Sequence, residues 1–286
     1  MSAVVDVQSL RERIEDVAAT PAGDPTPSDA DAVIRALLDA LEQGTVRSAE
    51  RTRDGQWRAV PWVKRGILLG FRLGHVVDMS PRDTSPFHFV DKNTYPTQRF
   101  APERGVRIVP GGSTVRRGAY VAPGVVCMPP MYINVGAFVG AGSMVDSHAL
   151  VGSCAQIGER VHLSAAAQIG GVLEPINAAP VVIEDDVFVG GGCGVYEGTI
   201  VRERAVLAAG VILTRGTPVF DLVRETVYRS GDAPLEIPAG AVVVPGSRQI
   251  HSGWGAEQGL SLQAPIIVKY RDQTTDASTA LEQALR

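Results

Sequence analysis

The sequence predicts a mainly β fold: a left-handed parallel β-helix of about six coils, with an α-rich domain before it and a small β-rich extension after it. Three observations support this prediction. Aliphatic residues recur at every sixth position through the middle of the chain, glycine or another small residue often follows them, and the preceding residues have helical periodicity. A period of six fits neither a helix nor alternating hairpin strands, but it fits a prism built from hexapeptide faces.

The N-terminal domain, predicted over residues 1–105, contains signals for three helices. A helix over Ser2–Ala19 would have one apolar face. A second, Ala32–Gln43, follows a capping-box-like stretch at Ser28–Asp31 and ends before a glycine. Pro61 suits the first turn of a third helix, because its missing N–H group has no partner to lose there. These helices would cap one open end of the β-helix.

The repeat defines the central domain, predicted over residues 106–222. Steps of six from Val109 to Ile169 always reach an aliphatic residue or a cysteine, and a second series runs from Ile183 to Val219. Each such residue is expected to point inward and stack on its counterpart one coil away, at about 4.8 Å. The two series are separated by more residues than two hexads need. The excess predicts a loop near residues 171–182.

The C-terminal extension, predicted over residues 223–286, combines strands with a short helix. Ala241–Pro245 and Ala264–Tyr270 have the composition of strands and flank a polar, glycine-rich turn. A last helix is expected from Asp276.

Composition excludes several classes of protein. The net charge is −4, with 45% hydrophobic and 20% charged residues, which argues against a disordered chain and against a nucleic-acid partner. The charge-free run Gly118–Val145 is too rich in glycine and proline for a membrane span, and the N-terminus has no signal-peptide pattern. Three cysteines without a C-x-x-C pattern favour a reduced, cytoplasmic setting.

The repeat also contains longer distinctive phrases. MVDSHALVGSCAQIG and GGVLEP, both within Gly142–Pro175, resemble the signature of tetrahydrodipicolinate N-succinyltransferases, in the hexapeptide-repeat acyltransferase superfamily. The similarity covers about residues 30–250 in the family's order. It implies transfer of a succinyl group from succinyl-CoA to the amine of tetrahydrodipicolinate, as acyclic 2-amino-6-oxopimelate, in lysine and diaminopimelate biosynthesis. It also implies a homotrimer with sites at the subunit boundaries.

The same resemblance implies roles for three residues. Asp146 matches the family's catalytic aspartate, which removes a proton from the amine. Arg107 matches an arginine that binds a substrate carboxylate, a task that suits its planar guanidinium. Ser147, beside Asp146, is assigned with these two to the substrate site.

Two positions depart from the family pattern. His148 stands where proteobacterial members have tryptophan, and Gly194 stands where they have a second essential acid. Glycine has no acid–base group, so either Asp146 acts alone or another residue replaces that acid. His148 is the first candidate, because two residues along a strand share a face, and Glu197 and Glu174 come next. His148 as an inert polar neighbour remains the alternative.

Coenzyme A recognition is predicted from backbone access. Gly170, Gly171 and Gly192 are positions where the backbone can approach a ligand closely. Arginines gather in the late coils and are candidates for the CoA phosphates, with solvated surface arginines as the alternative: Arg202, Arg204, Arg215 and Arg224.

The alternatives are an N-acetyltransferase, a protein without catalytic activity, and a zinc carbonic anhydrase on the same fold. An acetyl-CoA-dependent N-acetyltransferase would need the same site without a group that reads the distal carboxylate. A structural or sensor β-helix protein would catalyse no acyl transfer. A zinc site is not predicted, because His148 and His162 are 14 residues apart and His75, His88 and His251 lie outside the repeat.

Overall fold

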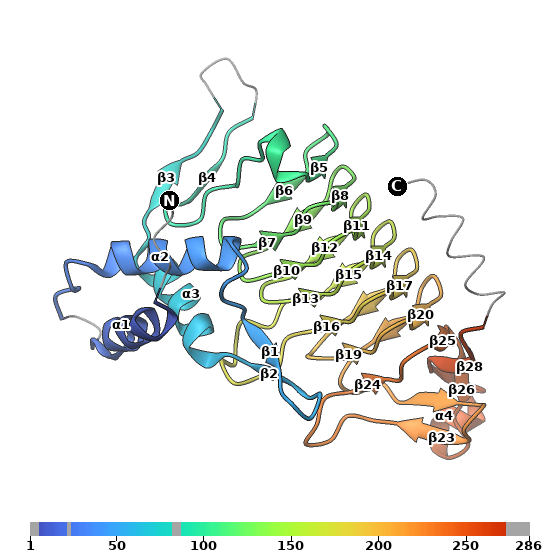
Figure 1. The fold of residues 1–286 in the computed structure, drawn as a ribbon. Helices are drawn as coiled ribbons and strands as arrows, with labels where there is room; N and C mark the ends of the chain where they lie inside the picture. The colour runs from blue at the N-terminus through green and yellow to red at the C-terminus, as the bar shows by residue number, and fades with distance from the viewer. Residues whose placement is uncertain (1–5, 22–23, 82–86, 273–286) are drawn as a thin grey trace.

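The computed structural model describes residues 6–21, 24–81 and 87–272. The chain forms three helices, then a stack of short strands, then a β-rich extension (Figure 1). The stack is a parallel β-helix with three sheet faces, in six-, ten- and six-stranded sheets. The predicted fold class is confirmed.

The strands of the stack are two residues long and recur every six residues. Strands 18 residues apart pair in parallel, as in Val121 with Val139 and Val139 with Ile157. Their bounds are β5 Arg107–Ile108, β6 Thr114–Val115, β7 Tyr120–Val121, β8 Val126–Cys127, β9 Tyr132–Ile133, β10 Phe138–Val139, β11 Met144–Val145, β12 Leu150–Val151, β13 Gln156–Ile157, β14 His162–Leu163, β15 Gln168–Ile169, β16 Val182–Ile183, β17 Phe188–Val189, β18 Gly194–Val195, β19 Ile200–Val201, β20 Val206–Leu207 and β21 Ile212–Leu213.

The core of the stack consists of the residues at every sixth position. From Val115 to Leu213 each of these is buried, so the predicted inward positions are confirmed over this range. One aliphatic side chain per face fills the prism at each level, which explains why the period tolerates so little variation. The loop between β15 and β16 spans residues 170–181, where the excess of residues predicts it.

The two ends of the repeat differ from the prediction. Ile108, rather than Val109, pairs with Cys127, because the turn between β5 and β6 contains an additional residue. Val219 is buried, but its strand β22 (Val219–Asp221) pairs with β28 (Ile266–Tyr270) and not with a strand of the preceding coil.

The final coil comes from later in the chain. Strands β24 (Glu236–Ile237) and β25 (Ala241–Val244) pair in parallel with β19 and β20. The parallel ladders therefore continue past residue 222, the predicted boundary of the central domain.

The N-terminal helices are α1 (Val7–Ala19), α2 (Ala30–Glu42) and α3 (Pro61–Leu73). Pro61 begins α3 as predicted. The predicted capping box is wrong: Asp29 is the N-cap of α2 without a side-chain cap, and its carboxylate pairs with Arg13 instead. The helices share a hydrophobic cluster with Val135 and Cys154 of the stack, so they pack directly on the β-helix.

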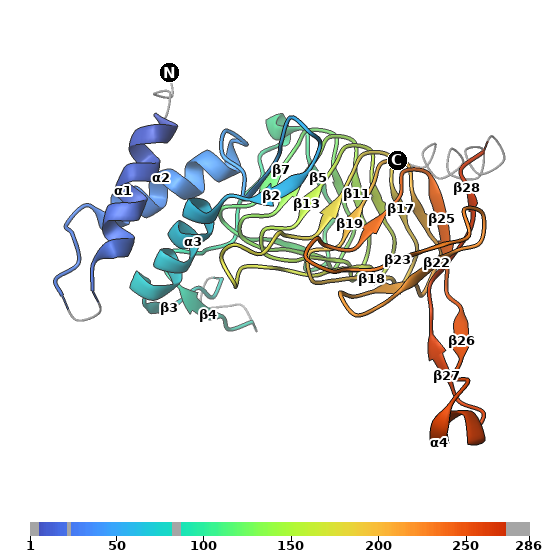
Figure 2. The same cartoon turned by 90° about the horizontal axis from the view of Figure 1, so that it is seen from below.

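Two hairpins and a 3₁₀ turn complete the N-terminal domain. They are β1 (Ala49–Arg51) with β2 (Trp57–Ala59), β3 (Val76–Asp78) with β4 (Val90–Lys92), and η1 (Pro102–Arg104). Figures 1 and 2 both show the β1–β2 hairpin lying against the side of the stack.

The C-terminal strands β25 and β28 are antiparallel neighbours and confirm the two predicted strands. Strand β23 (Thr226–Tyr228) pairs with β22. Between β25 and β28, the strands β26 (Ser247–Gln249) and β27 (Ser261–Gln263) and the short helix α4 (Gly253–Glu257) form an arm that projects from the body (Figure 2). The helix predicted from Asp276 lies outside the described residues. Among the described helices, none has the length and apolar character needed to cross a membrane.

Candidate active site

A cavity of about 850 Å³ lies at the corner of the prism where β15, β18 and β21 end. Its walls come from four parts of the chain: the turns after these strands, the 170–181 loop, residues 230–234, and strand β2 of the N-terminal hairpin. Its volume is within the range of small-molecule sites. Four residues predicted from the sequence line it, as does the further candidate Glu174: Gly170, Gly171, Glu197 and Arg215.

Two charged side chains at this corner, Glu197 and Arg215, form hydrogen bonds with the backbone. The Glu197 carboxylate accepts a hydrogen bond from the backbone N–H of Arg215 at 2.7 Å. The guanidinium of Arg215 donates to the Gly231 carbonyl at 3.3 Å, and no carboxylate among the described residues forms an ion pair with it. Arg58, by contrast, pairs with Glu50 at 2.8 Å. Of the described cations that line this cavity, Arg215 is therefore the one available to an anionic ligand.

Asp146 lies at a different corner. Strand β11 ends at Val145, and Asp146 begins the turn, half-buried, with its N–H donating to the Leu163 carbonyl at 2.9 Å. The carboxylate of Asp146 accepts from the N–H of Ser147 at 2.7 Å, which fixes the side chain at the surface of the turn.

His148 does not share a strand face with Asp146. It lies in the same turn with a φ of 62°, so the two-residue alternation of a strand does not apply to it. Its side chain lines a shallow groove of about 420 Å³ together with Tyr132, Leu150 and Gln168. The predicted common strand face is therefore wrong.

Arg107 and Gly192 also lie outside the large cavity. Arg107 is exposed on β5, two coils from β11 on the same sheet. Gly192 lies at the corner of Asp146 and His148, where its N–H donates to the Ala165 carbonyl at 2.9 Å. Within one chain, the structure thus separates Arg107, Asp146, Ser147, His148 and Gly192 from the cavity that holds the other predicted residues.

Tyr196 occupies the space next to Gly194. A Cβ atom placed on Gly194 would lie 2.5 Å from Cε2 of Tyr196, and one on Gly170 would lie 2.9 Å from Cδ1. Such distances are far inside van der Waals contact, so the half-buried ring rests on both glycines at the wall of the cavity. Sequence reasoning missed Tyr196. The signal that could have found it is a glycine on each of two adjacent coils, Gly170 and Gly194, next to the large side chain of Tyr196.

The loop wall is anchored by a buried lysine. Lys64 of α3 is fully buried, and its Nζ donates to the Ala178 carbonyl at 2.6 Å. Burial lowers the pKa of Lys64, because the ammonium has left water without gaining a carboxylate partner among the described residues. The helix α3 thereby fixes one side of the cavity.

The three cysteines are buried and not disulfide-bonded. Desolvation raises the pKa of Cys127 to about 12 and that of Cys154 to about 11, and it also raises the pKa of Cys193. Their thiolates are therefore strongly disfavoured at neutral pH, and none is suited to act as a nucleophile. Across the described residues, no cluster of three histidine, cysteine or acidic side chains could hold a metal ion.

Two family models match parts of the chain. Residues 9–73 match the N-terminal domain of tetrahydrodipicolinate N-succinyltransferase, and residues 180–215 match the hexapeptide repeat of succinyltransferases.

Curated relatives match almost the whole chain, and each is named 2,3,4,5-tetrahydropyridine-2,6-dicarboxylate N-succinyltransferase. The protein from Polynucleobacter asymbioticus is 42% identical over 98% of both chains. The one from Ralstonia nicotianae is 43% identical over 98% of both, and the one from Azoarcus is 43% identical over 98% of this chain and 99% of its own. The chain belongs to the family of 2,3,4,5-tetrahydropyridine-2,6-dicarboxylate N-succinyltransferases.

Proposed function

We propose that this protein transfers the succinyl group of succinyl-CoA to the amine of tetrahydrodipicolinate, as 2-amino-6-oxopimelate, in lysine and diaminopimelate biosynthesis. The observation that carries the proposal is the identity of 42–43% to curated relatives of that name across nearly their full length. The cavity at the ends of β15, β18 and β21 supports it with a binding site of suitable volume.

The acyl donor occupies this cavity in our proposal. Gly170 and Gly171 present bare backbone to the pantetheine arm, and Arg215 offers its guanidinium to an anionic group of the donor. The Tyr196 hydroxyl makes no hydrogen bond to any described residue, so it is available to donate one to a ligand oxygen. Tyr196 would then supply a polar group beside Gly194, the position at which the resemblance implies an acid.

Asp146 supplies the base. Its carboxylate takes a proton from the substrate ammonium, and the free amine attacks the thioester carbonyl carbon. In the tetrahedral intermediate the attacking nitrogen gives up its second proton, the carbon–sulfur bond breaks as the intermediate collapses, and the leaving CoA thiolate takes up that proton. The Asp146 carboxyl returns the first proton to solvent. Hydrogen-bond donors at the developing oxyanion lower the barrier of this step. Arg107 and Ser147 remain proposed contacts to the acceptor, and His148 a proposed neighbour of Asp146.

A homotrimer would reunite the separated residues. Asp146 and the cavity lie on different corners of one prism, so a neighbouring copy is needed to bring them together. The outward side chains of one sheet face include four apolar residues, two on each side of His162, that suit packing against another copy: Val126, Met144, Phe188 and Val206. A cytoplasmic location, without a membrane or nucleic-acid partner, fits the proposed pathway.

The test is a thiol-release assay with purified protein. We expect release from succinyl-CoA only when tetrahydrodipicolinate is present, and slower release from acetyl-CoA. Faster release from acetyl-CoA than from succinyl-CoA would favour the N-acetyltransferase. No thiol release with either donor would contradict acyl transfer and leave a structural or sensor role.

A further inference from the structure

We propose that Glu184 is a positioning residue of the acyl-donor cavity: it holds Trp57 of the N-terminal hairpin in the cavity wall, and the N-terminal domain is thereby part of the donor site. The inference rests on the proposed function, because it assumes that the cavity binds coenzyme A.

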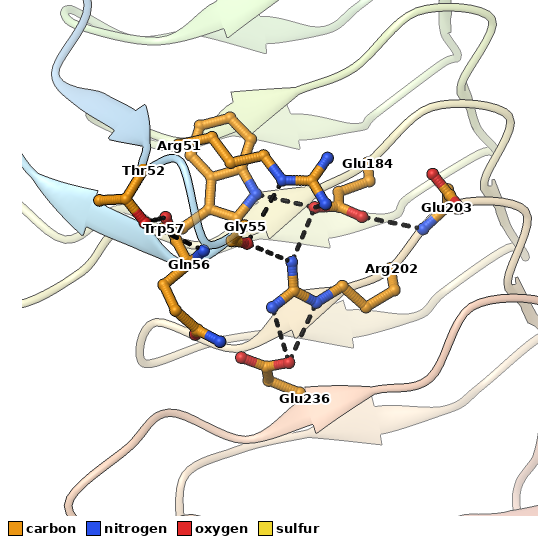
Figure 3. A network of polar contacts seen from close by, with 9 residues as sticks. All are labelled: Arg51, Thr52, Gly55, Gln56, Trp57, Glu184, Arg202, Glu203 and Glu236. Carbon is orange, nitrogen blue, oxygen red and sulfur yellow. Dashed lines mark hydrogen bonds and ion pairs between the residues drawn. The ribbon is translucent and has the colours of Figure 1, made fainter.

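Glu184 is a buried carboxylate whose partners among the described residues are N–H donors, with the Arg51 guanidinium also 3.8 Å from Oε1. Its side chain is 6% exposed and lies in the turn after β16. Oε1 accepts from Nε1 of Trp57 at 2.8 Å and from Nη1 of Arg202 at 3.0 Å, and Oε2 accepts from the backbone N–H of Glu203 at 3.1 Å. Figure 3 shows these donors converging on the carboxylate from the hairpin and from the next coil. A buried carboxylate is stable only with such partners.

Arg202 extends the network to both sides. Its Nη1 also donates to the Gly55 carbonyl of the hairpin turn at 3.1 Å. Its Nε and Nη2 donate to the Glu236 carboxylate of β24 at 3.0 and 2.8 Å (Figure 3). The guanidinium therefore links the hairpin to the last coil, while Glu184 fixes the orientation of the indole.

Trp57 separates two cavities. It lines the 850 Å³ cavity and also a neighbouring cavity of about 350 Å³, which Glu184 lines as well. The next two hairpin residues, Arg58 and Ala59, belong to the wall of the larger cavity. Displacement of the indole would therefore alter the wall and join the two spaces.

The hairpin cannot hold this position by itself. Its strands β1 and β2 have three residues each, and an isolated pair of that length is marginally stable in water. The core of the β-helix does not include the hairpin, so loss of the Glu184 contacts should affect ligand binding more than global folding.

Glu184→Gln is the first test. Both oxygens of Glu184 accept hydrogen bonds, whereas a glutamine has one oxygen, so at least one donor loses its partner in either amide orientation. Trp57→Phe is the second variant, because it keeps an aromatic wall but removes the indole N–H. Asp54→Asn is the matched control: it makes the same change of charge at the exposed tip of the same hairpin, where the carboxylate accepts from Thr52 and contacts neither Glu184 nor Arg202.

Steady-state kinetics separates positioning from catalysis. For Glu184→Gln and Trp57→Phe we expect the KM for succinyl-CoA to rise about tenfold, as for loss of one charge-assisted hydrogen bond, with kcat within about twofold. Asp54→Asn should match the wild type. An unchanged KM in both variants overturns the inference, whether or not kcat falls.

Fluorescence gives a readout independent of activity. Of the three tryptophans, Trp62 is buried among the N-terminal helices and Trp254 lies on the projecting arm. Titration of the wild type with coenzyme A should therefore change the emission of Trp57, and the change should be absent in Trp57→Phe. A full signal in Trp57→Phe overturns the inference. If calorimetry detects no binding of coenzyme A to the wild type, the proposed function itself fails.

Discussion

Gly194 and Tyr196 form a pair in which one residue is small because the other is large. The ring of Tyr196 lies where a Cβ of Gly194 would have to be, at a distance of 2.5 Å. Tyr196 thus places a phenol beside Gly194 at the wall of the cavity.

Gly194→Ala should displace Tyr196 without unfolding the protein. We expect the Kd for coenzyme A, measured by calorimetry, to rise about tenfold as one hydrogen bond and its aromatic contacts are lost. Gly216→Ala is the matched control, because a Cβ there meets no atom within 4 Å. Wild-type affinity in Gly194→Ala would show that the ring has no part in binding.

Asp146→Asn should leave the fold intact, because the side chain accepts only the Ser147 N–H in its own turn. Loss of the base is expected to lower turnover by roughly 10²-fold. The measurement is thiol release, with circular dichroism as the control for folding. Near-full turnover would remove Asp146 from the mechanism.

At the scale of elements, helix α3 and the 170–181 loop are joined by the hydrogen bond between Lys64 and Ala178. The ammonium is buried and its pKa is lowered, so charging it in the folded protein is less favourable than in the unfolded chain. This cost is fully present below the lowered pKa. It disappears as pH rises to 10.5, the ordinary value for lysine.

Lys64→Met should therefore loosen the loop without lowering global stability. We expect faster proteolytic cleavage in the 170–181 loop and a melting temperature at or above that of the wild type at pH 7. The difference in stability in favour of methionine should shrink as pH approaches 10.5. A lower melting temperature with unchanged loop cleavage would mean that the lysine supports the core instead.

The repeat was predictable because each hexad encodes its own face. One inward aliphatic side chain per face sets the period, so the coils from Val115 to Leu213 follow from the sequence alone. The ends were not predictable in the same way. The last coil is built from β24 and β25, which return after an excursion with no periodicity to signal the pairing.

The site was predictable only where it follows the repeat. Gly170, Gly171, Glu197 and Arg215 share one corner because they stand in equivalent turns of stacked coils. Trp57 and Glu184 meet across 127 residues of sequence, through packing of one domain on another. No local pattern signals such a contact, and the same holds for the anchoring of the loop by Lys64.

At the scale of the whole molecule, the account requires two neighbouring copies for each complete site, and a closed trimer would hold three such sites. Analytical ultracentrifugation should find a species of three 30.3 kDa chains at micromolar concentration. Replacing Phe188 and Met144, on the apolar outward face, with aspartate should shift it toward monomer and abolish turnover, because Asp146 would lose the neighbouring cavity. An active monomer would contradict the shared site.

A crystal structure with coenzyme A and an acceptor analogue tests the central claim most directly. The account predicts the pantetheine arm in the cavity beside Gly170, Gly171 and Tyr196, with the carboxylate of Asp146 from a neighbouring copy within hydrogen-bond distance of the acceptor amine. Coenzyme A bound elsewhere, or an Asp146 remote from the acceptor, would contradict it.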